Sequence, residues 1–351
     1  MTSSKQVEKS LRVAVVMGGP SAEHAISVSS GTEVVRALTQ LGHIAVPILI
    51  TEQQTWHLLD ATTLLSTKTS LEQVGNTSLA LIPQSQALAP LSGVGEAGVD
   101  LVFIAMHGPY GEDGKIQALM ELLQLPYTGS GVLASALSMD KVQFRRIMQA
   151  EHISIPPSHT FTNENVEEMT SILKNVVGEP PLVVKPSDQG SSIGVSIVHS
   201  WKELASAVAL ARKSGKTILV DRFVKGREFT VGIVGTKEPR VLPVTEIIPD
   251  GEFFDYRAKY LSTNMNDICP ADISDQLASQ LQAIALQVYR AVGATGFARV
   301  DFIVDEKDMP VVLEINTIPG LTPVSLLPIA AKAAGLSFAE LIQEIALDAL
   351  S

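Results

Sequence analysis

The stretch Val311-Val-Leu-Glu-Ile-Asn316 decides the fold of this chain, together with the run Phe297-Ala-Arg-Val-Asp-Phe302 shortly before it. Alternate side chains of a strand share one face, so Glu314 and Asn316 project side by side. The earlier run continues from Phe297 to Val304 and is also strand-like, and the polar segment Asp305-Glu-Lys-Asp308 supplies a turn between the two. The pattern predicts a hairpin with polar side chains on one face.

This hairpin brings Asp301 level with Glu314 and Asn316. Three hard oxygen ligands with Arg299 beside them suit Mg²⁺ bridging polyphosphate oxygens, which indicates ATP chemistry. Two simpler interpretations stay open at this point. A buried arginine needs an anionic partner, so Arg299 could form a salt bridge with Asp301 or Glu314. The pair Glu314 and Asn316 could also belong to an ordinary half-exposed strand face.

The composition bounds the class of protein. With 351 residues, 46% of them hydrophobic, the chain is expected to bury large cores in two or three domains. A formal net charge of −11 argues against a nucleic-acid or anionic-membrane partner. The single cysteine, Cys269, excludes an internal disulfide and fits a reducing cytoplasm. Residues 1–10 are expected to form a polar tail rather than a signal peptide, and no apolar stretch is long enough to cross a bilayer.

Strands and helices alternate in the first third of the chain. Residues 11–17 form an apolar run typical of a buried strand and end at Gly18-Gly-Pro20. We expect Ser21 to cap the following helix, with Glu23 in its first turn, where the helix dipole favours an acid. Further strands are predicted at 43–50 and 99–106, and a helix at 114–123. This order is typical of an open parallel sheet with helices on both faces, an α/β domain.

The rest of the chain has an α+β pattern. A helical pattern spans residues 131–150, with these expected core positions: Leu133, Leu137, Phe144 and Ile147. Strands at 181–185 and 194–198 enclose a loop of small residues, which predicts a strand–loop–strand unit. The other predicted elements are a helix at 201–213, strands at 217–224 and 228–234, a helix at 273–292, and helices from Ser325 onward.

The loop Asp188-Gln-Gly-Ser-Ser-Ile-Gly194 presents backbone N–H groups that no bulky side chain shields. It can close over a polyphosphate, with Ser191 and Ser192 adding hydroxyl donors. It is neither a Walker loop nor a dinucleotide-binding turn, and a Gly/Ser loop alone is equally typical of a plain hairpin. Lys185 precedes this loop, as a phosphate clamp or as a lysine that reaches the surface. Lys141, by itself, is typical of a solvated helix face.

Together and in this order, the motifs of the chain resemble those of the D-alanine–D-alanine ligases, a family of the ATP-grasp superfamily. The resemblance extends from about Leu11 to the C-terminal helices. It rests on these motifs: Gly18-Gly-Pro-Ser-Ala-Glu23, His107-Gly-Pro-Tyr-Gly-Glu-Asp-Gly114, Tyr127-Thr-Gly-Ser-Gly131, Ser138-Met-Asp-Lys141, Val184-Lys-Pro186, Gly190-Ser-Ser-Ile-Gly194, Tyr256-Arg-Ala-Lys-Tyr260, Arg299-Val-Asp301 and Glu314-Ile-Asn-Thr-Ile-Pro-Gly320.

The resemblance implies a three-domain ATP-grasp fold, α/β at its start and α+β in its C-terminal half. After the tail at 1–10, an N-terminal open parallel-sheet domain that binds substrate would span residues 11–128. A central ATP-grasp subdomain would span residues 129–223 and a C-terminal catalytic subdomain residues 224–351, with ATP between two antiparallel sheets. The resemblance also implies a cytoplasmic homodimer that takes D-alanine and ATP and binds neither nucleic acid nor membrane.

The implied reaction has two steps. The carboxylate of a first D-alanine attacks the γ-phosphate of ATP, which gives an acylphosphate and ADP. The amino group of a second D-alanine then displaces phosphate to form D-alanyl-D-alanine for peptidoglycan. Physical chemistry supports this order, because a carboxylate is a poor electrophile, phosphoryl transfer needs cations, and an acylphosphate must be shielded from water.

The resemblance also implies roles for individual residues. Two Mg²⁺ ions, or Mn²⁺ in their place, would be held by Asp301, Glu314 and Asn316. ATP would contact Lys141, Lys185, Ser191, Ser192, Asp221, Phe223, Val224, Glu228 and Lys259. The amino-acid substrates would contact Glu23, His107, Arg299, Ser325 and Leu326. Arg299 and the backbone N–H of Gly320 would stabilise the tetrahedral oxyanion.

Ser191 and Tyr260 resemble the partners of Glu23 in a hydrogen-bonded triad that holds a lid over the site. Tyr260 also bears on specificity, because a phenylalanine commonly stands there in relatives that make D-alanyl-D-lactate. A tyrosine therefore favours an amine as second substrate. Four departures from the commoner pattern concern fine specificity and lid dynamics rather than the reaction class: Ala25, Phe254, Val324 and Asp221.

Three other functions fit parts of the pattern. A depsipeptide or D-alanyl-D-serine ligase is disfavoured by Tyr260. A carboxylase that phosphorylates bicarbonate is disfavoured by the turn that ends at Glu23 and by the segment Tyr256-Arg-Ala-Lys-Tyr260. A catalytically silent nucleotide- or amino-acid-binding protein is disfavoured because the expected metal ligands, lysines and arginine are all present.

Overall fold

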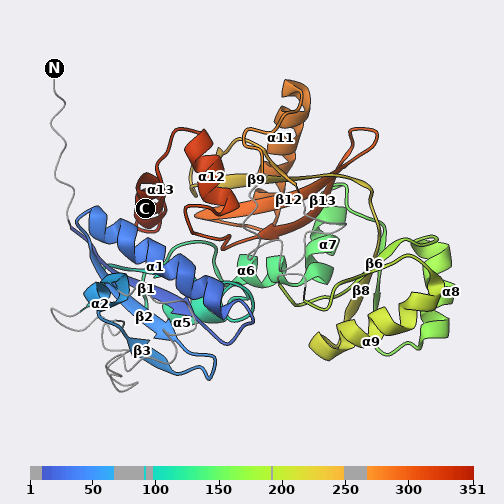
Figure 1. The fold of residues 1–351 in the computed structure, drawn as a ribbon, viewed down its shortest axis with the longest axis horizontal. Coiled ribbons are helices and arrows are strands. Elements are labelled where there is room, and N and C mark those ends of the chain that lie inside the picture. The colour runs from blue at the N-terminus through green and yellow to red at the C-terminus, as the bar shows by residue number, and fades with distance from the viewer. Residues whose placement is uncertain (1–9, 67–90, 92–97, 191–192, 249–266) are drawn as a thin grey trace.

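The structure is a computed structural model that describes residues 10–66, 91, 98–190, 193–248 and 267–351. The described residues form three β-sheets arranged along the longest axis of the molecule, and helices cover them (Figure 1). The N-terminal sheet lies at one end and the sheet of the middle part of the chain at the other, with the C-terminal sheet between them. We refer to the three parts as the N-terminal, central and C-terminal units.

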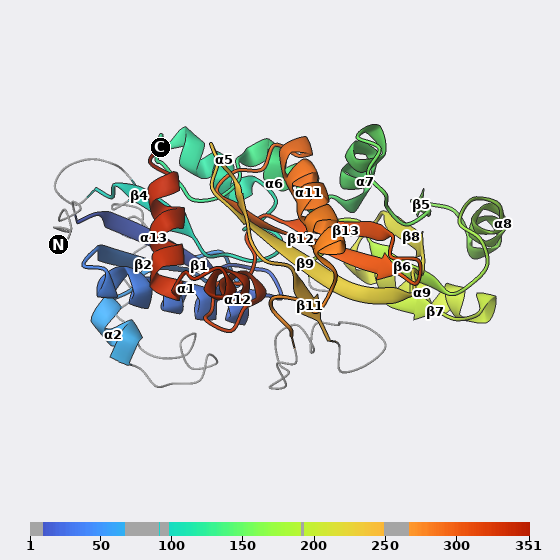
Figure 2. The ribbon, with the colours of Figure 1, turned by 90° about the horizontal axis from the view of Figure 1, so that it is seen from above.

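The N-terminal unit contains β1 (Arg12–Gly18), α1 (His24–Gln40), β2 (Ile44–Ile50), β3 (Trp56–Leu58), α2 (Ala61–Ser66), β4 (Leu101–Ile104) and α5 (Lys115–Leu122). The strand order is β3-β2-β1-β4, with β1 parallel to β2 and β4 and with β3 antiparallel at the edge. Continuous apolar runs suit strands that are covered on both faces. Figure 2 shows α1 and α2 on one face and α5 on the other. The predicted open parallel sheet is confirmed.

The start of α1 differs from the prediction that Ser21 caps it. The helix begins at His24, and Glu23 holds the N-cap position without a side-chain cap. Ser21 Oγ instead accepts from the N–H of Glu23 at 3.2 Å and donates to the carbonyl of His107 at 2.9 Å. Ser21 stands too far before the helix to reach its first free N–H groups, so it joins two loops instead of capping.

The central unit contains α6 (Val132–Met139), α7 (Lys141–Ala150), β5 (Ser158–Phe161), α8 (Val166–Val176), β6 (Leu182–Pro186), β7 (Ser196–Val198), the short 3₁₀ helix η2 (Trp201–Glu203), α9 (Leu204–Ser214) and β8 (Ile218–Arg222). Its sheet has the order β5-β8-β6-β7, and all three pairings are antiparallel. The predicted strand–loop–strand unit is therefore confirmed as β6 and β7. The buried apolar residues of this sheet, α8 and α9 form a cluster of their own.

The prediction of one helix over residues 131–150 is wrong, because the helix breaks at Asp140. This residue has extended backbone, and its side chain accepts from the N–H groups of Val142 and Gln143 at 2.9 and 3.2 Å, which caps α7. Because α6 and α7 are separate helices, their buried faces do not follow one continuous helical pattern over residues 131–150. As a result, Phe144 is buried as expected, whereas Leu133 is 70% exposed.

The C-terminal unit contains β9 (Gly226–Val234), β10 (Arg240–Val241), β11 (Thr245–Ile247), α11 (Asp275–Ala291), β12 (Phe297–Asp305), β13 (Pro310–Asn316), α12 (Leu326–Ala333) and α13 (Phe338–Asp348). Its strands are antiparallel in the order β10-β9-β12-β13, with β11 also paired to β9. Apolar side chains of α11 and α7 pack on this sheet. By contrast, α13 packs against α1, and α12 packs against α13 and β9. Apolar side chains of both helices share the core of the N-terminal sheet (Figure 1).

A helix must be both long and apolar to cross a bilayer. No single helix in the described ranges meets both requirements. The helices α12 and α13 meet them only together, as a pair bent by 104°.

Candidate active site

The acidic hairpin forms as predicted and places its polar residues in register. β12 and β13 pair antiparallel, with Asp301 opposite Glu314 and Arg299 opposite Asn316. The register shifts between Asp301 and Phe302, a bulge of the kind that redirects side chains near functional sites. The prediction that Asp301 lies level with Glu314 is confirmed.

Asp301 is buried, and its carboxylate accepts four hydrogen bonds. Oδ1 accepts from Arg299 Nε at 2.8 Å and from Thr230 Oγ1 at 2.6 Å. Oδ2 accepts from Arg299 Nη2 at 2.9 Å and from Asn316 Nδ2 at 3.0 Å. The salt bridge left open for Arg299 is therefore present. Because a carboxylate offers about four acceptor positions, a cation that binds Asp301 has to replace at least one of these donors.

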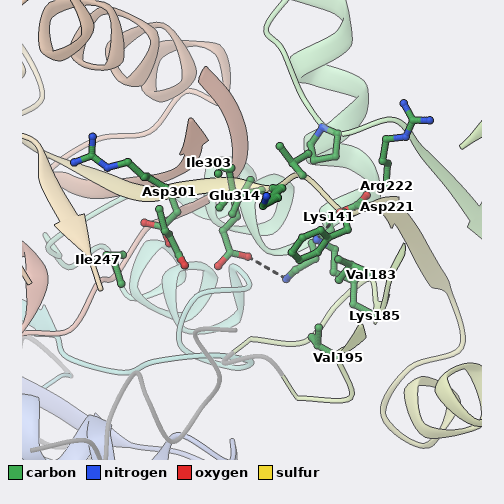
Figure 3. Close-up of a pocket in the computed structure, with 18 of the residues that line it drawn as sticks. Lys141, Val183, Lys185, Val195, Asp221, Arg222, Ile247, Asp301, Ile303 and Glu314 are labelled. Carbon is green, nitrogen blue, oxygen red and sulfur yellow. Dashed lines mark ion pairs between the residues drawn. The ribbon is translucent and has the colours of Figure 1, made fainter. Parts of the chain in front are cut away.

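Glu314 points toward Lys141, as Figure 3 shows. Lys141 Nζ lies 3.5 Å from Glu314 Oε2 and also donates to the carbonyl of Gln189 at 2.8 Å. Lys141 is the first residue of α7, and its backbone N–H donates to the carbonyl of Ser187 at 2.9 Å. Its side chain is only 13% exposed, so the interpretation as a solvated surface lysine is wrong. Lys141 connects the segment before residue 191 with the acidic hairpin.

A second lysine belongs to a buried cluster of three charged side chains. Lys185 Nζ and Arg145 Nη2 each lie 2.8 Å from Asp221 Oδ2. Arg145 also donates to the carbonyl of Val312 at 3.2 Å, which ties the cluster to β13. Burial lowers the pKa of Lys185, and the charge of Asp221 opposes that shift. Two cations share one carboxylate, so the cluster favours the approach of an anion.

A cavity of about 380 Å³ lies between the central and C-terminal sheets. Its size is in the range of small-molecule sites, and apolar side chains such as Val183, Val195 and Ile303 form part of its wall (Figure 3). Asp221 Oδ1 is buried without a hydrogen-bond partner in the described part of the chain. The residues predicted to contact ATP that line this cavity are Lys141, Lys185, Asp221, Phe223, Val224 and Glu228.

A smaller cavity, of about 40 Å³, adjoins the first. Both are lined by Lys141, Gly190 and Glu314, so they meet at these three residues. Of the expected metal ligands, Asp301 lines the larger cavity, Asn316 the smaller and Glu314 both. The residues predicted to contact the first amino acid or the oxyanion that line the smaller cavity are Glu23, His107, Arg299 and Gly320.

Two glycines allow loops of different units to approach Glu23. A Cβ on Gly108 would lie 2.0 Å from Glu23 Oε2, and the φ of +72° at Gly108 also disfavours any side chain. A Cβ on Gly190 would lie 2.9 Å from the same oxygen. The central unit therefore reaches the N-terminal unit directly over the Glu23 carboxylate.

The remaining predicted residues lie near the site or outside the described chain. Ser325 precedes α12, and its Oγ accepts from the N–H of Thr322 at 3.1 Å. A Cβ on Gly320 would lie 2.8 Å from this Oγ, so Ser325 is next to the Gly320 turn, and Leu326 begins α12. Four predicted residues lie outside the described residues and stay predictions: Ser191, Ser192, Lys259 and Tyr260.

Two residues of the site were not predicted from the sequence. Arg145 occupies a polar position of an amphipathic helix and is typical there of a surface residue. Glu112 accepts from the N–H groups of Gly108 at 2.7 Å and Ile318 at 3.0 Å. Burial and then the charge of Glu23 raise the pKa of Glu112 to about 8. An acid inside a glycine-rich motif was the available signal for Glu112.

These features define the class of protein. A cavity large enough for a nucleotide lies between two antiparallel sheets, with cations contributed by the central unit and acids by the C-terminal unit. Beside it lies a small polar cavity that meets the first where Lys141 and Glu314 face each other. This arrangement is that of an ATP-grasp ligase.

Comparison with known proteins identifies the family. A family model described as D-ala D-ala ligase N-terminus matches residues 12–130, and one described as D-ala D-ala ligase C-terminus matches residues 147–346. The D-alanine–D-alanine ligase of Pelotomaculum thermopropionicum is 38% identical over 95% of each chain. That of Geobacter sulfurreducens is 38% identical over 97% of this chain and 95% of its own. The chain belongs to the D-alanine–D-alanine ligase family.

Solved structures agree with this assignment. The D-alanine-D-alanine ligase from Coxiella burnetii has a TM-score of 0.83 and 29% identity, covering 97% of this chain and 94% of its own. The VanG D-Ala:D-Ser ligase from Enterococcus faecalis has a TM-score of 0.81 and 29% identity, covering 97% of this chain and 100% of its own. Both likenesses extend over all three units.

Proposed function

We propose that this protein joins two D-alanine molecules through a D-alanyl phosphate, converting ATP to ADP and phosphate, and so supplies D-alanyl-D-alanine for peptidoglycan. The observation that carries the proposal is the junction of the two cavities at Lys141, Gly190 and Glu314. The γ-phosphate of a nucleotide in the larger cavity would reach this junction. The carboxylate of an amino acid held by Glu23 in the smaller cavity would meet it there.

The larger cavity suits adenine at the segment 221–224. Asp221 Oδ1 is a buried acceptor without a partner among the described residues, and the amino group of adenine is a donor. An unpaired buried polar group costs about 1–3 kcal/mol, so a donor at this position is favourable. The other contacts proposed are Glu228 to the ribose hydroxyls, Lys141 and Lys185 to the α- and β-phosphates, Ser191 and Ser192 to the same phosphates, and Lys259 to the γ-phosphate.

We propose Asp301, Glu314 and Asn316 as ligands of two Mg²⁺ ions, with Glu314 shared and Mn²⁺ as a substitute. Two carboxylates and an amide oxygen suit a hard cation. Asn316 now turns its amide N–H toward Asp301, so ligation requires its amide oxygen to take that side. When bound, Mg²⁺ neutralises charge on the phosphoryl oxygens.

Residues of this chain orient the two substrates. Glu23 would bind the ammonium group of the first D-alanine. Arg299 and the Gly320 N–H would stabilise the oxyanion that forms when the second amino group attacks. The carboxylate of the second D-alanine would lie at Ser325 and Leu326, beside the Gly320 turn. Placed this way, the attacking amine and the acylphosphate meet inside the small cavity.

D-Serine is the alternative second substrate. The likeness to the VanG D-Ala:D-Ser ligase favours D-serine. Tyr260 argues against both D-serine and D-lactate as the second substrate. Tyr260, together with Ser191 and Glu23, would hold the lid that shields the acylphosphate from water.

The test is phosphate release from Mg-ATP with D-alanine, L-alanine, D-alanine plus D-serine, or D-alanine plus D-lactate, with products identified by mass. We expect D-alanyl-D-alanine from the D-isomer and none from L-alanine. Phosphate release without a dipeptide would mean that another nucleophile is the acceptor. ATP binding without D-alanine-dependent release would refute the proposal in favour of a silent binding protein.

The cellular setting is part of the proposal. We infer a homodimer in the cytoplasm, and the three domains 11–128, 129–223 and 224–351, from the family to which the chain belongs. The single Cys269 suits a reducing compartment. Sedimentation equilibrium would test the dimer, and limited proteolysis would test the domain limits.

A further inference from the structure

Glu112 joins two segments that are far apart in the chain. Its Oε2 accepts from the N–H of Gly108, four residues earlier, at 2.7 Å. Its Oε1 accepts from the N–H of Ile318, 206 residues later, at 3.0 Å. One carboxyl group therefore ties the loop 107–114 of the N-terminal unit to the loop 317–321 of the C-terminal unit. The second of these loops contains Gly320.

The same peptide of loop 317–321 is also held on its other side. The carbonyl of Ile318 lies 2.8 Å from His107 Nδ1. A carbonyl can only accept, so Nδ1 carries the proton and Nε2 accepts from the hydroxyl of Ser30 at 2.7 Å. Ser30 Oγ in turn accepts from the N–H of Leu321 at 3.2 Å. Burial lowers the pKa of His107, which favours this neutral ring.

Loop 317–321 is thus fixed on both sides of Gly320. Ile318 is held through its N–H by Glu112 and through its carbonyl by His107, while Leu321 is held by Ser30. These three side chains belong to the N-terminal unit, which also lines the small cavity through Glu23. The unit that binds the first substrate therefore sets where the Gly320 N–H points.

We propose that Glu112 is a positioning residue for the second step of the reaction, which holds loop 317–321 so that the Gly320 N–H faces the developing oxyanion. The inference rests on the proposed function, because it requires an oxyanion at Gly320. Glu112 also lines the small cavity, and the role proposed for it is to hold this loop rather than to bind substrate. His107 acts with Glu112 from the opposite side of the same peptide.

The charge of Glu23 connects substrate binding to Glu112, which holds loop 317–321. The two carboxylates meet at Gly108, because Glu112 accepts from its N–H and a Cβ there would lie 2.0 Å from Glu23 Oε2. Burial and then repulsion by Glu23 raise the pKa of Glu112, while the hydrogen bonds from Gly108 and Ile318 and the charge of Arg299 lower it. A substrate ammonium at Glu23 removes that repulsion and favours ionised Glu112, whose hydrogen bonds to N–H groups are stronger. Arrival of the first substrate therefore tightens the hold on loop 317–321.

The variant Glu112→Gln tests the proposal. Glutamine keeps the shape of the side chain, but its amide NH₂ would face one of the two N–H donors. One of the two hydrogen bonds, from Gly108 or from Ile318, is therefore lost. We expect kcat for D-alanyl-D-alanine formation to fall about 10- to 100-fold, the usual effect of losing a hydrogen bond to a charged group. The D-alanine-dependent positional isotope exchange of labelled ATP, which reports the first step alone, should fall much less. The KM for ATP should stay unchanged.

Asp113→Asn is the matched control. Asp113 lies in the same loop and also accepts from two N–H groups, those of Tyr110 and Lys115, but among the described residues it makes no hydrogen bond to loop 317–321. It should keep the wild-type ratio of dipeptide formation to isotope exchange. An equal loss in both variants, or a parallel loss of exchange and dipeptide formation in Glu112→Gln, would show a structural role only and would overturn the inference.

A second pair of variants covers the case in which Glu112→Gln does not fold. His107→Asn can present a side-chain N–H to the Ile318 carbonyl, whereas His107→Ala cannot. We expect the asparagine variant to keep more dipeptide formation relative to exchange, and equal ratios would overturn the inference. Failure of the proposed function is distinguishable, because the wild-type protein itself would then make no D-alanyl-D-alanine.

Discussion

Replacing Asp221 with asparagine should destabilise the central and C-terminal units strongly. The carboxylate is 4% exposed and lies 2.8 Å from both Lys185 Nζ and Arg145 Nη2. Asparagine keeps the volume but leaves two buried cations without an anion. Breaking a buried ion pair in this way costs about 3–5 kcal/mol. With an unfolding entropy of about 2.1 cal/mol/K per residue and a unit of about 220 residues, the melting temperature should fall by about 6–11 °C.

The loss of stability caused by Asp221→Asn should become smaller as the pH rises. Burial lowers the pKa of Lys185, and Asp221 opposes that shift, so its removal lowers this pKa further. At pH values between the folded-state pKa of Lys185 and the ordinary lysine value, the unfolded chain binds more protons than the folded protein. The free energy of unfolding therefore increases with pH in this range. In the variant the folded-state pKa of Lys185 is lower, so this increase in stability begins at a lower pH. The difference in melting temperature from the wild type should therefore narrow as the pH rises from neutral toward the ordinary lysine value of 10.5.

Thermal unfolding of the nucleotide-free protein over this pH range is the assay. Glu306→Gln is the control, because the Lys225–Glu306 pair has the same 2.8 Å separation but side chains that are 81% and 69% exposed. An exposed pair contributes little, so its loss should leave the melting temperature unchanged. If Asp221→Asn behaves like this control, or if its deficit grows with pH, the reasoning about the buried cluster is refuted.

Three further predictions address function. Glu314→Gln should abolish D-alanine-dependent phosphate release and leave the melting temperature near the wild-type value, because the shared metal charge is lost from a half-buried side chain; retained turnover would contradict the metal assignment. Tyr260→Phe should raise the share of D-lactate product over D-alanine product by mass, and an unchanged ratio would exclude a role in specificity. Inosine triphosphate should have a KM at least about tenfold above that of ATP, because its carbonyl oxygen would face the acceptor Asp221 Oδ1, and equal KM values would contradict the adenine placement.

The sequence predicts well those parts of the fold that depend on local pattern. The hairpin of β12 and β13 follows from alternation and from the polar turn 305–308, and both strands form within one or two residues of the prediction. The helix at 131–150 fails for a local reason of another kind. Asp140 finds two N–H groups to accept from, and this capping outweighs an apolar pattern that continues across it.

Contacts between residues that are far apart in the chain could not be predicted from the sequence. Arg145 and Asp221 are 76 residues apart, and Glu112 and Ile318 are 206 residues apart. Each side chain is unremarkable in its own segment, a polar position on a helix or an acid in a loop. Only the tertiary fold brings each pair together in a buried place, within the central unit for Arg145 and Asp221 and between two units for Glu112 and Ile318, and an unpaired charge there would be costly.

The kind of contact between units explains where the site lies. The N-terminal unit and the helices α12 and α13 share one apolar core, whose exposure would cost about 25 cal/mol per Å². The central unit packs apolar side chains of α7 on the C-terminal sheet. Beside the nucleotide cavity, however, its described contacts with the hairpin include the polar pairs Lys141–Glu314 and Arg145–Val312. A polar group can exchange a hydrogen-bond partner in the protein for water or phosphate at little net cost in free energy, because one hydrogen bond replaces another. In the proposed reaction, a phosphate at Lys141 and a cation at Glu314 would replace this ion pair, and the cavity would admit its charged ligands without exposing a core.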